Sequence, residues 1–224
     1  MIQLIENAFE YKNRLAIISD HNNYTYDDLL KRSANIAHQL LNGKADLEEA
    51  RVAFIVDPGF DYTCIQWGIW QAGGIAVPLC VKHPFKSIEY VIEDTQASVV
   101  ILSTAYEKLM APLDERKGIR VIRNQEFNDH QGELPEIAIS RRAMILYTSG
   151  TTGKPKGVVT THKNIEKQIT SLTTSWEWHQ DDHILNVLPL HHVHGIINVM
   201  SCALWSGGCC EFLPKFDPKK IFEI

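Results

Sequence analysis

The chain alternates between apolar stretches of strand length and amphipathic stretches of helical length. The apolar stretches are rich in Val, Ile and Leu, which predicts strands buried on both faces. They lie at residues 51–57, 75–79, 98–103, 143–149 and 183–189. Amphipathic segments with helical spacing accompany them, at residues 26–41 and 163–176. This alternation predicts an α/β fold with largely parallel sheets flanked by helices.

Both predicted helices carry their apolar residues on one stripe. In the first helix, the stripe comprises Leu29, Leu30, Ala34, Ala37 and Leu41. In the second, it comprises Ile165, Ile169, Leu172 and Trp176. Asp27 and Asp28 suit the start of the first helix, because carboxylates are stabilised at the positive end of the helix dipole. Gly43 follows just beyond its end, so the end signals agree with a helix over residues 26–41.

The composition describes an ordinary globular protein. The 224 residues are 45% hydrophobic and 22% charged, with a formal net charge of −5. This allows a sizeable core in one large domain or two small ones. The mild acidity disfavours nucleic acid and anionic membranes as partners, since both favour a basic surface. No apolar run is long enough to span a bilayer.

The cysteines and the N-terminal residues predict a cytoplasmic location. Residues 1–20 carry early acidic side chains and no uninterrupted apolar stretch, unlike a secretory signal. The cysteines lie at positions 64, 80, 202, 209 and 210, with no C-x-x-C spacing. Their odd number favours reduced thiols, as expected in the cytoplasm.

Two segments bear on domain organisation. Residues 123–136 are polar and rich in turn formers, so we expect a surface connection there and a possible subdivision near residues 123–140. At the C-terminus, Asp217 and Pro218 have the character of a helix start. The chain stops about two turns later, so we expect that it ends before its natural domain boundary.

The segment YTSGTTGKPKGVV, residues 147–159, is the strongest candidate for chemistry. Its composition suits neither a strand nor a helix, and the nine residues from Thr148 to Lys156 exceed what a simple turn needs. A surface turn is one explanation. The other is an anion cradle, in which close backbone N–H groups, hydroxyls and lysines bind phosphate. Only two residues separate Gly150 from Gly153, which excludes the Walker spacing of P-loop enzymes.

The sequence resembles those of the adenylate-forming enzymes: acyl-CoA synthetases, luciferase-like ligases and the adenylation domains of peptide synthetases. The resemblance rests on motifs in the family's order: YTYDDL at 24–29, WQAGGIAVPLCVKHP at 70–84, YTSGTTGKPKGV at 147–158 and LPLHHVHG at 188–195. It spans nearly the whole chain. Residues 78–101 and 176–198, and the turn at 205–208, are most similar to the malonyl-CoA synthetase branch.

The resemblance implies a reaction in two halves. A carboxylate attacks the α-phosphorus of ATP to give an acyl-adenylate and pyrophosphate, and the thiol of coenzyme A then displaces AMP. The residues that would hold the β- and γ-phosphates are Thr148, Ser149, Gly150, Thr151, Thr152, Gly153 and Lys154, with Lys156 near the exit of the loop. Hydrogen bonds to charged oxygens are worth about 1.5–3 kcal/mol each, which suits a loop that stabilises a leaving pyrophosphate.

The histidine cluster HHVH has three explanations. A metal site is disfavoured, because neighbours along a strand point to opposite faces and no Cys or carboxylate partner is apparent, so no metal ligand is predicted. Backbone groups at a strand end would satisfy His191 and His194. The resemblance places His192 in the acyl pocket as a catalytic residue that orients the carboxylate or adenylate, since an ionised carboxylate needs no base. Gly195 and Ile196 would line the same pocket, with ordinary core packing as the alternative.

Other parts of the family's machinery do not occur in this sequence: the glutamate segment that stacks adenine and positions Mg²⁺, the ribose-binding aspartate and the C-terminal lysine. We therefore expect residues 1–224 to be the N-terminal part of the large adenylation domain, inactive by itself. The enzyme would use ATP, Mg²⁺ and coenzyme A, with the Mg²⁺ ligand outside this chain. The expected substrate is a small carboxylate such as malonate. A ligase for medium- or long-chain fatty acids and a non-catalytic nucleotide-binding module are the alternatives.

Overall fold

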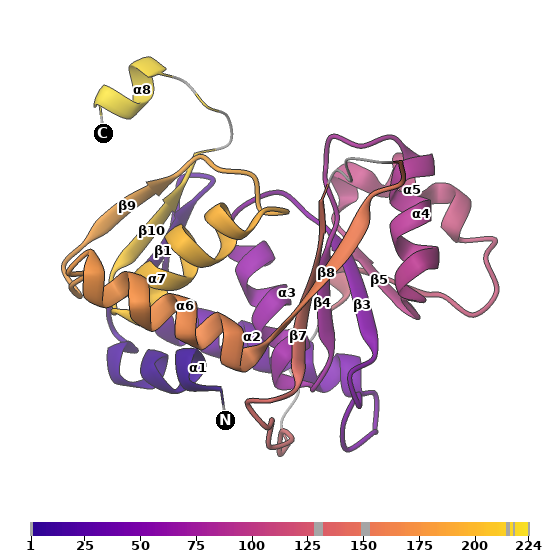
Figure 1. Cartoon of the computed structure of the whole chain (residues 1–224), viewed down its shortest axis with the longest axis horizontal. Helices are drawn as coiled ribbons and strands as arrows, with labels where there is room; N and C mark the ends of the chain where they lie inside the picture. Colours follow the sequence, from indigo (N-terminus) through magenta and orange to yellow (C-terminus); the bar gives the residue numbers. More distant parts are fainter. Residues whose placement is uncertain (1, 128–131, 149–152, 214–215, 217, 224) are drawn as a thin grey trace.

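The computed structural model describes residues 2–127, 132–148, 153–213, 216 and 218–223. It contains two sheets, with the helices α2 (Tyr26–Leu41) and α3 (Phe60–Gln71) between them (Figure 1). The larger sheet has the strand order β6-β5-β3-β4-β7-β8, and the smaller has the order β2-β1-β10-β9. Among the described strands, every pairing is parallel except β1 with β2 and β7 with β8. The predicted α/β fold with largely parallel sheets is confirmed.

The bounds of the elements are as follows. The larger sheet contains β3 (Arg51–Ile55), β4 (Ile75–Pro78), β5 (Val99–Leu102), β6 (Arg120–Arg123), β7 (Arg142–Thr148) and β8 (Lys156–Thr161). The smaller contains β1 (Leu15–Ser19), β2 (Asn22–Thr25), β9 (His183–Asn186) and β10 (Cys209–Phe212). Further α-helices are α1 (Gln3–Ala8), α4 (Phe85–Thr95), α5 (Glu107–Met110), α6 (His162–Ser175), α7 (Cys202–Trp205) and α8 (Pro218–Glu223). Short 3-10 helices lie at Phe9–Tyr11, Thr104–Tyr106, Ala111–Leu113 and Asn124–Glu126, and a π-helix spans His194–Ser201.

The two faces of the larger sheet bury different sets of side chains. Along β3, Val52 and Phe54 belong to the core shared with α2, α3 and the smaller sheet, whereas Ala53 and Ile55 belong to the core shared with α4. This division follows from the period of two along a strand. It explains why the strand reads as a continuous apolar run, as expected for a central parallel strand. No helix of the described residues combines the length and apolarity that a membrane span requires.

Helix α2 occupies the predicted range, residues 26–41. Its N-cap is Thr25, whose Oγ1 accepts a hydrogen bond from the N–H of Asp28 at 3.2 Å, while the Asp28 carboxylate accepts one from the N–H of Thr25 at 2.8 Å. This reciprocal pair satisfies two backbone donors of the first turn. The hydrogen bonds from Thr25 lower the pKa of Asp28, so the cap is made by the ionised carboxylate.

Several expectations from the sequence are corrected. Trp176 is the C-cap residue of α6 and is 57% exposed, so it does not belong to the buried stripe of that helix. Strand β9 is not buried on both faces, because it lies at the edge of the smaller sheet. Residues 123–136 are not solely a surface connection, since Asn124 and Phe127 are buried. The possible subdivision near residues 123–140 stays a prediction.

The candidate phosphate loop lies at the turn of a β-hairpin. Strand β7 continues through Tyr147 and Thr148, and β8 begins at Lys156, so both ends of the segment 147–159 form strands. The expectation that this composition makes a poor strand was therefore wrong at its ends. Thr148 lies opposite Lys156 in the antiparallel pairing. Strand β8 is the edge strand of the sheet and is exposed as far as Val159, which explains why so polar a sequence can form it.

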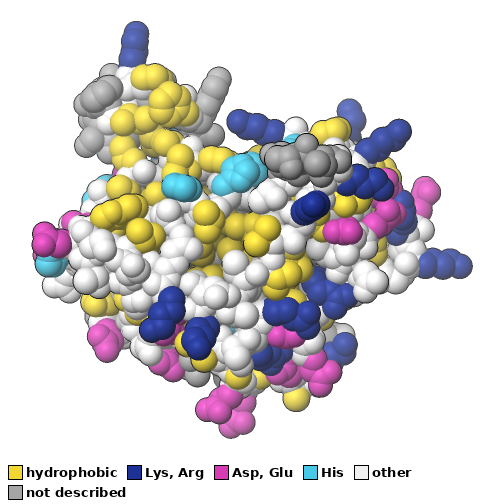
Figure 2. All heavy atoms as spheres, viewed as in Figure 1, with side chains coloured by type: hydrophobic (Ala, Val, Ile, Leu, Met, Phe, Trp, Pro, Cys, Tyr) yellow, Lys and Arg dark blue, Asp and Glu magenta, His cyan; other side chains and the backbone are white. Residues whose placement is uncertain are grey.

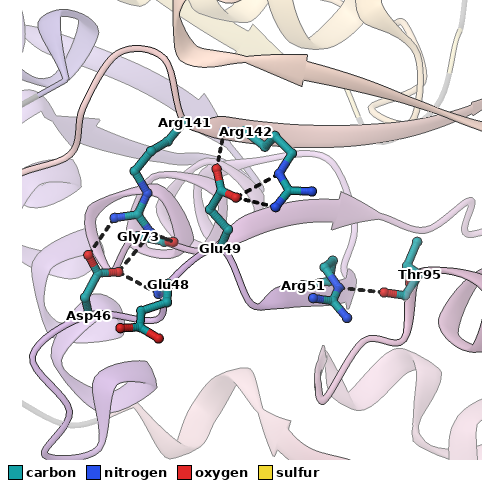
Figure 3. A network of polar contacts seen from close by, with 8 residues as sticks. All are labelled: Asp46, Glu48, Glu49, Arg51, Gly73, Thr95, Arg141 and Arg142. Atoms are coloured by element: carbon teal, nitrogen blue, oxygen red, sulfur yellow. Dashed lines mark hydrogen bonds and ion pairs between the residues drawn. The ribbon is translucent and has the colours of Figure 1, made fainter.

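The start of β7 is fixed by two arginines (Figure 3). The Nη1 and Nη2 atoms of Arg141 donate to Asp46 at 2.5 and 2.9 Å, and Nη2 also donates to the carbonyl of Gly73 at 2.7 Å. Arg142 donates its backbone N–H and its guanidinium to the carboxylate of Glu49. The hydrogen bonds from Arg141 hold the pKa of the Asp46 carboxyl below its usual value. These contacts anchor β7 at the end opposite the hairpin turn.

Candidate functional site

A cleft of about 690 Å³ opens at the carboxyl ends of β4 and β7. These strands are parallel neighbours, so the loops that follow them meet at one edge of the sheet, the usual position of ligand sites in α/β folds. The lining residues are Pro78 at the end of β4, with Leu79, Cys80 and His83 after it; Lys86, Ser87, Tyr90 and Val91 of α4; Tyr147, Thr148, Lys154 and Pro155 of the hairpin; and His191 and His192 after β9. We call this site the β4–β7 cleft.

The described lining of the cleft carries no carboxylate. Lys86 and Lys154 supply positive charge, three histidines supply imidazole groups, and neither Asp nor Glu occurs among the described lining residues. Figure 2 shows histidine side chains on the upper part of one face, beside several Lys and Arg side chains. The whole chain has a net charge of −5, so the positive charge of this lining is opposite in sign to that of the chain. A cleft lined by one sign of charge attracts the opposite sign, here an anion.

The histidine loop after β9 is held by buried hydrogen bonds. The hydroxyl of Tyr62, on α3, donates to the carbonyl of Leu190 at 2.7 Å. The side-chain amide of Asn186 donates to the carbonyl of Gly195 at 3.0 Å, and its oxygen accepts from the N–H of Leu188 at 3.1 Å. The loop is therefore tied at both ends to buried groups, which fixes the position of the histidines between them.

The rings of His83, His191 and His192 lie close together at the cleft. Their centroids lie 6.4 Å apart from His83 to His191 and 4.2 Å apart from His191 to His192. The expectation that neighbouring histidines point to opposite faces was wrong, because residues 190–192 form a turn and not a strand. Burial, then the nearby His192, His83 and Lys82, lowers the pKa of His191 to about 4. His191 is therefore neutral at pH 7, with one donor and one acceptor.

Tyr90 of α4 connects the cleft wall to the hairpin. Its hydroxyl donates to the carbonyl of Pro155 at 3.1 Å, and Nζ of Lys154 lies 5.3 Å from the centroid of its ring, within the range of a cation–π contact. Its ring also meets that of Tyr147 edge-on at 6.3 Å. The hydroxyl of Tyr147 donates to Asp94, also on α4, at 2.5 Å. Helix α4 thus holds both arms of the hairpin.

The predicted phosphate ligands are only partly covered by the described residues. Thr148 and Lys154 line the cleft. Gly153 and Lys156 are exposed but do not line it. The remaining predicted ligands, Ser149, Gly150, Thr151 and Thr152, lie outside the described residues. The structure therefore brings Thr148, at the start of the predicted loop, and Lys154 to the cleft, but not Lys156.

The predicted residues of the acyl pocket occupy two different environments. His192 is exposed and lines the β4–β7 cleft. Gly195 and Ile196 are buried in the π-helix, and Ile196 belongs to the main hydrophobic core. They do not line the cleft, so their assignment to the substrate pocket stays a prediction.

Sequence reasoning did not assign Lys86 or Tyr90 to the site, although both line it. Their spacing of four residues places both on one face of a helix, but no signal in the sequence shows that this face lies at the hairpin. No group of three or more His, Cys, Asp or Glu among the described residues is arranged to hold a metal ion. The described donors are instead suited to a polyphosphate, whose oxygens accept from ammonium, hydroxyl and imidazole groups.

Comparisons with known proteins agree with this geometry. The chain is 40% identical over 228 residues to the human mitochondrial malonate–CoA ligase ACSF3, with 96% of the chain and 40% of that protein covered. It is 32% identical over 238 residues to a malonate–CoA ligase of Arabidopsis thaliana, with 94% of the chain and 39% of that protein covered. The chain thus spans about 40% of the length of these curated relatives.

The fold also matches solved structures. That of ATP-bound MatB from Rhodopseudomonas palustris superposes with a TM-score of 0.88 at 25% identity, covering 99% of this chain and 47% of that one. The family model of the AMP-binding enzymes matches residues 4–224. Together with the cleft and the motifs around it, this match establishes that the chain belongs to the AMP-binding enzyme family.

Proposed function

We propose that the whole protein is an ATP-dependent acyl-CoA synthetase. It converts a carboxylic acid and ATP into an acyl-adenylate and pyrophosphate, and then transfers the acyl group to the thiol of coenzyme A. The observation that carries this proposal is the β4–β7 cleft, where Lys86, Lys154 and Thr148 meet His192 without any carboxylate in the described lining. Family membership supports the same reaction class.

The residues of the cleft suit the first half of this reaction. Negative charge builds on the phosphate oxygens as pyrophosphate leaves, and preorganised donors stabilise that charge. Lys154 and the hydroxyl of Thr148 would supply donors to the β- and γ-phosphates. His192, which also lines the cleft, would orient the attacking carboxylate by hydrogen bonding. The carboxylate is ionised at pH 7 and needs no general base. Mg²⁺, when bound, would neutralise part of the phosphate charge, and its protein ligand is expected outside residues 1–224.

We propose malonate as the carboxylate. The support is the similarity to proteins named malonate–CoA ligases in a vertebrate and a plant. All five cysteines are free, which fits a reducing compartment, and we propose the cytoplasm. The human relative is named as mitochondrial, so fractionation of cells that produce the protein is the direct test of this location.

The phosphate site is tested by calorimetry on the chain itself, with ATP and with inorganic pyrophosphate. Replacing Lys154 by Ala removes a charge-assisted contact worth about 1.5–3 kcal/mol, so the affinity should fall roughly 10- to 100-fold. Lys163→Ala is the matched control, because Lys163 is an exposed lysine of α6 outside the cleft. Equal affinities for the two variants would contradict the assignment of the cleft.

The reaction is tested in the full-length protein with malonate, octanoate and palmitate, by following pyrophosphate release and formation of the thioester. We expect the highest kcat/KM with malonate. A preference for octanoate or palmitate would replace malonate by a fatty acid and leave the reaction class intact. Absence of adenylate with every carboxylate, despite tight ATP binding, would instead favour a non-catalytic nucleotide-binding module.

A further inference from the structure

We propose a second ligand site in this chain, a cavity between α1, α6 and the end of α3 that binds a small, uncharged, largely apolar molecule with one hydroxyl group. The cavity has a volume of about 210 Å³ and shares no lining residue with the β4–β7 cleft. Its walls include Trp70, Ile165, Ile169 and Trp205, with Ile139 also among the lining residues. We call it the α6 cavity. The proposal is independent of the function proposed above.

His162 is the group that makes this cavity a binding site. The residue is 4% exposed and lines the cavity. Its backbone N–H donates to the carbonyl of Arg141 at 3.1 Å, and its ring meets the ring of Trp70 edge-on at 5.6 Å. Within the described part of the chain, neither ring nitrogen has a hydrogen-bond partner. Buried polar groups are nearly always paired, so this imidazole, which lies at the wall of an accessible cavity, would pair with a polar group that enters there.

The charge at the cavity selects an uncharged partner. Burial, reinforced by the charge of Arg141, lowers the pKa of His162 to about 4, so the imidazole is neutral at pH 7. A neutral imidazole offers one donor and one acceptor, and a hydroxyl group can pair with either of them. Glu166 also lines the cavity and repels an anion. Glu166 would attract a cation, but an uncharged ligand avoids the desolvation cost that the isoleucine and tryptophan side chains of the lining impose on any ion.

The volume sets the size of the ligand. An engineered apolar cavity of about 150 Å³ in another protein stays dry and binds benzene. The α6 cavity is somewhat larger, so one six-membered ring with one or two small substituents fits its volume. A phenol matches the shape, the apolar walls and the hydroxyl that His162 requires. Trp70 and Trp205 provide aromatic surface against which such a ring packs.

The test compares two probes of the same shape, 4-fluorophenol and 4-fluorotoluene, by fluorine NMR titration of the whole chain. We expect both to bind at one site, with the phenol tighter by about two- to tenfold, the value of one net hydrogen bond. His162→Phe should abolish this difference, because the phenyl ring keeps the shape and removes the polar atoms. Equal affinities of the two probes for the unmodified chain would overturn the proposal, as would binding of neither.

Two surface variants locate the site without disturbing the core. Ile139 is 45% exposed, so Ile139→Trp adds bulk at the rim of the cavity and should block both probes. Val158, on the edge strand β8, is 48% exposed and does not line the cavity. Val158→Trp should therefore leave binding unchanged. Probe binding that survives Ile139→Trp, or that pyrophosphate displaces, would assign the probes to another site and refute the proposal. These variants decide the question even if His162→Phe fails to fold.

Discussion

Gly73→Ala should be among the most destabilising single-methyl additions in this chain. Gly73 has φ +80°, a left-handed conformation that costs an L-residue about 1–2 kcal/mol. A Cβ atom there would lie 2.2 Å from Oδ1 of Asp46 and 3.0 Å from Nη2 of Arg141. The Asp46 carboxylate must therefore move, which breaks charge-assisted hydrogen bonds worth about 1.5–3 kcal/mol. The two effects together lower the free energy of unfolding by about 3–5 kcal/mol.

The matched control is Gly43→Ala, which isolates the backbone effect. Gly43 has φ +85°, and a Cβ atom there would meet nothing within 4 Å. We expect the free energy of unfolding of this variant to fall by only about 1–2 kcal/mol. Urea unfolding followed by tryptophan fluorescence and far-ultraviolet circular dichroism measures both changes, provided that the slope with urea concentration is unchanged. If Gly73→Ala is no worse than Gly43→Ala, the contact between Asp46 and Arg141 contributes nothing measurable to stability.

Further predictions concern buried polar groups and one helix cap, each measured by urea unfolding. Tyr26→Phe removes a buried hydroxyl that donates to the Gly208 carbonyl at 2.7 Å and should cost about 1–2 kcal/mol, whereas Tyr11→Phe should cost almost nothing. His162 has a folded pKa of about 4 against 6.5 unfolded, so the unfolded chain takes up its proton first. Stability should therefore fall by about 3 kcal/mol from pH 6.5 to pH 4, and a curve unchanged by His162→Phe would contradict this. Thr161→Ala removes the N-cap of α6 and should lower the free energy of unfolding by about 1 kcal/mol. An unchanged free energy of unfolding would mean that the cap does not stabilise the fold.

The elements predicted best from sequence are those whose pattern is set by local burial. Helix α2 begins and ends as predicted, because one face carries its apolar residues and the ends carry polar signals. Strand β3 was expected because both of its faces are buried, which leaves an uninterrupted apolar run. Strand β8 was missed for the opposite reason: it is an edge strand whose valines, Val158 and Val159, face solvent. Its pairing with β7, and not its composition, makes it a strand.

The residues of the candidate site also show what local sequence patterns do not predict. The motif identified Thr148, Lys154 and His192, all of which line the β4–β7 cleft. Lys86 and Tyr90 were not assigned, because they come from α4, and only the adjacency of β4 and β7 in the sheet brings that helix to the hairpin. Strand order arises from long-range packing, which a periodic pattern does not encode. Local patterns therefore predict elements more reliably than they predict which elements meet.

Arg141 and Arg142 form ion pairs at the start of β7. We call these ion pairs the anchor, and their position makes the length of β7 a functional constraint. Strand β7 runs from Arg142, which makes one of the ion pairs, to Thr148, the first residue of the candidate phosphate loop, a span of roughly 20 Å. Because successive side chains alternate between faces, inserting or deleting one residue would turn Thr148 away from the cleft while the anchor stayed in place. We infer that the length of β7 sets the position of the candidate phosphate loop relative to the ion pairs. Its exposed positions can therefore vary in sequence, but its number of residues cannot.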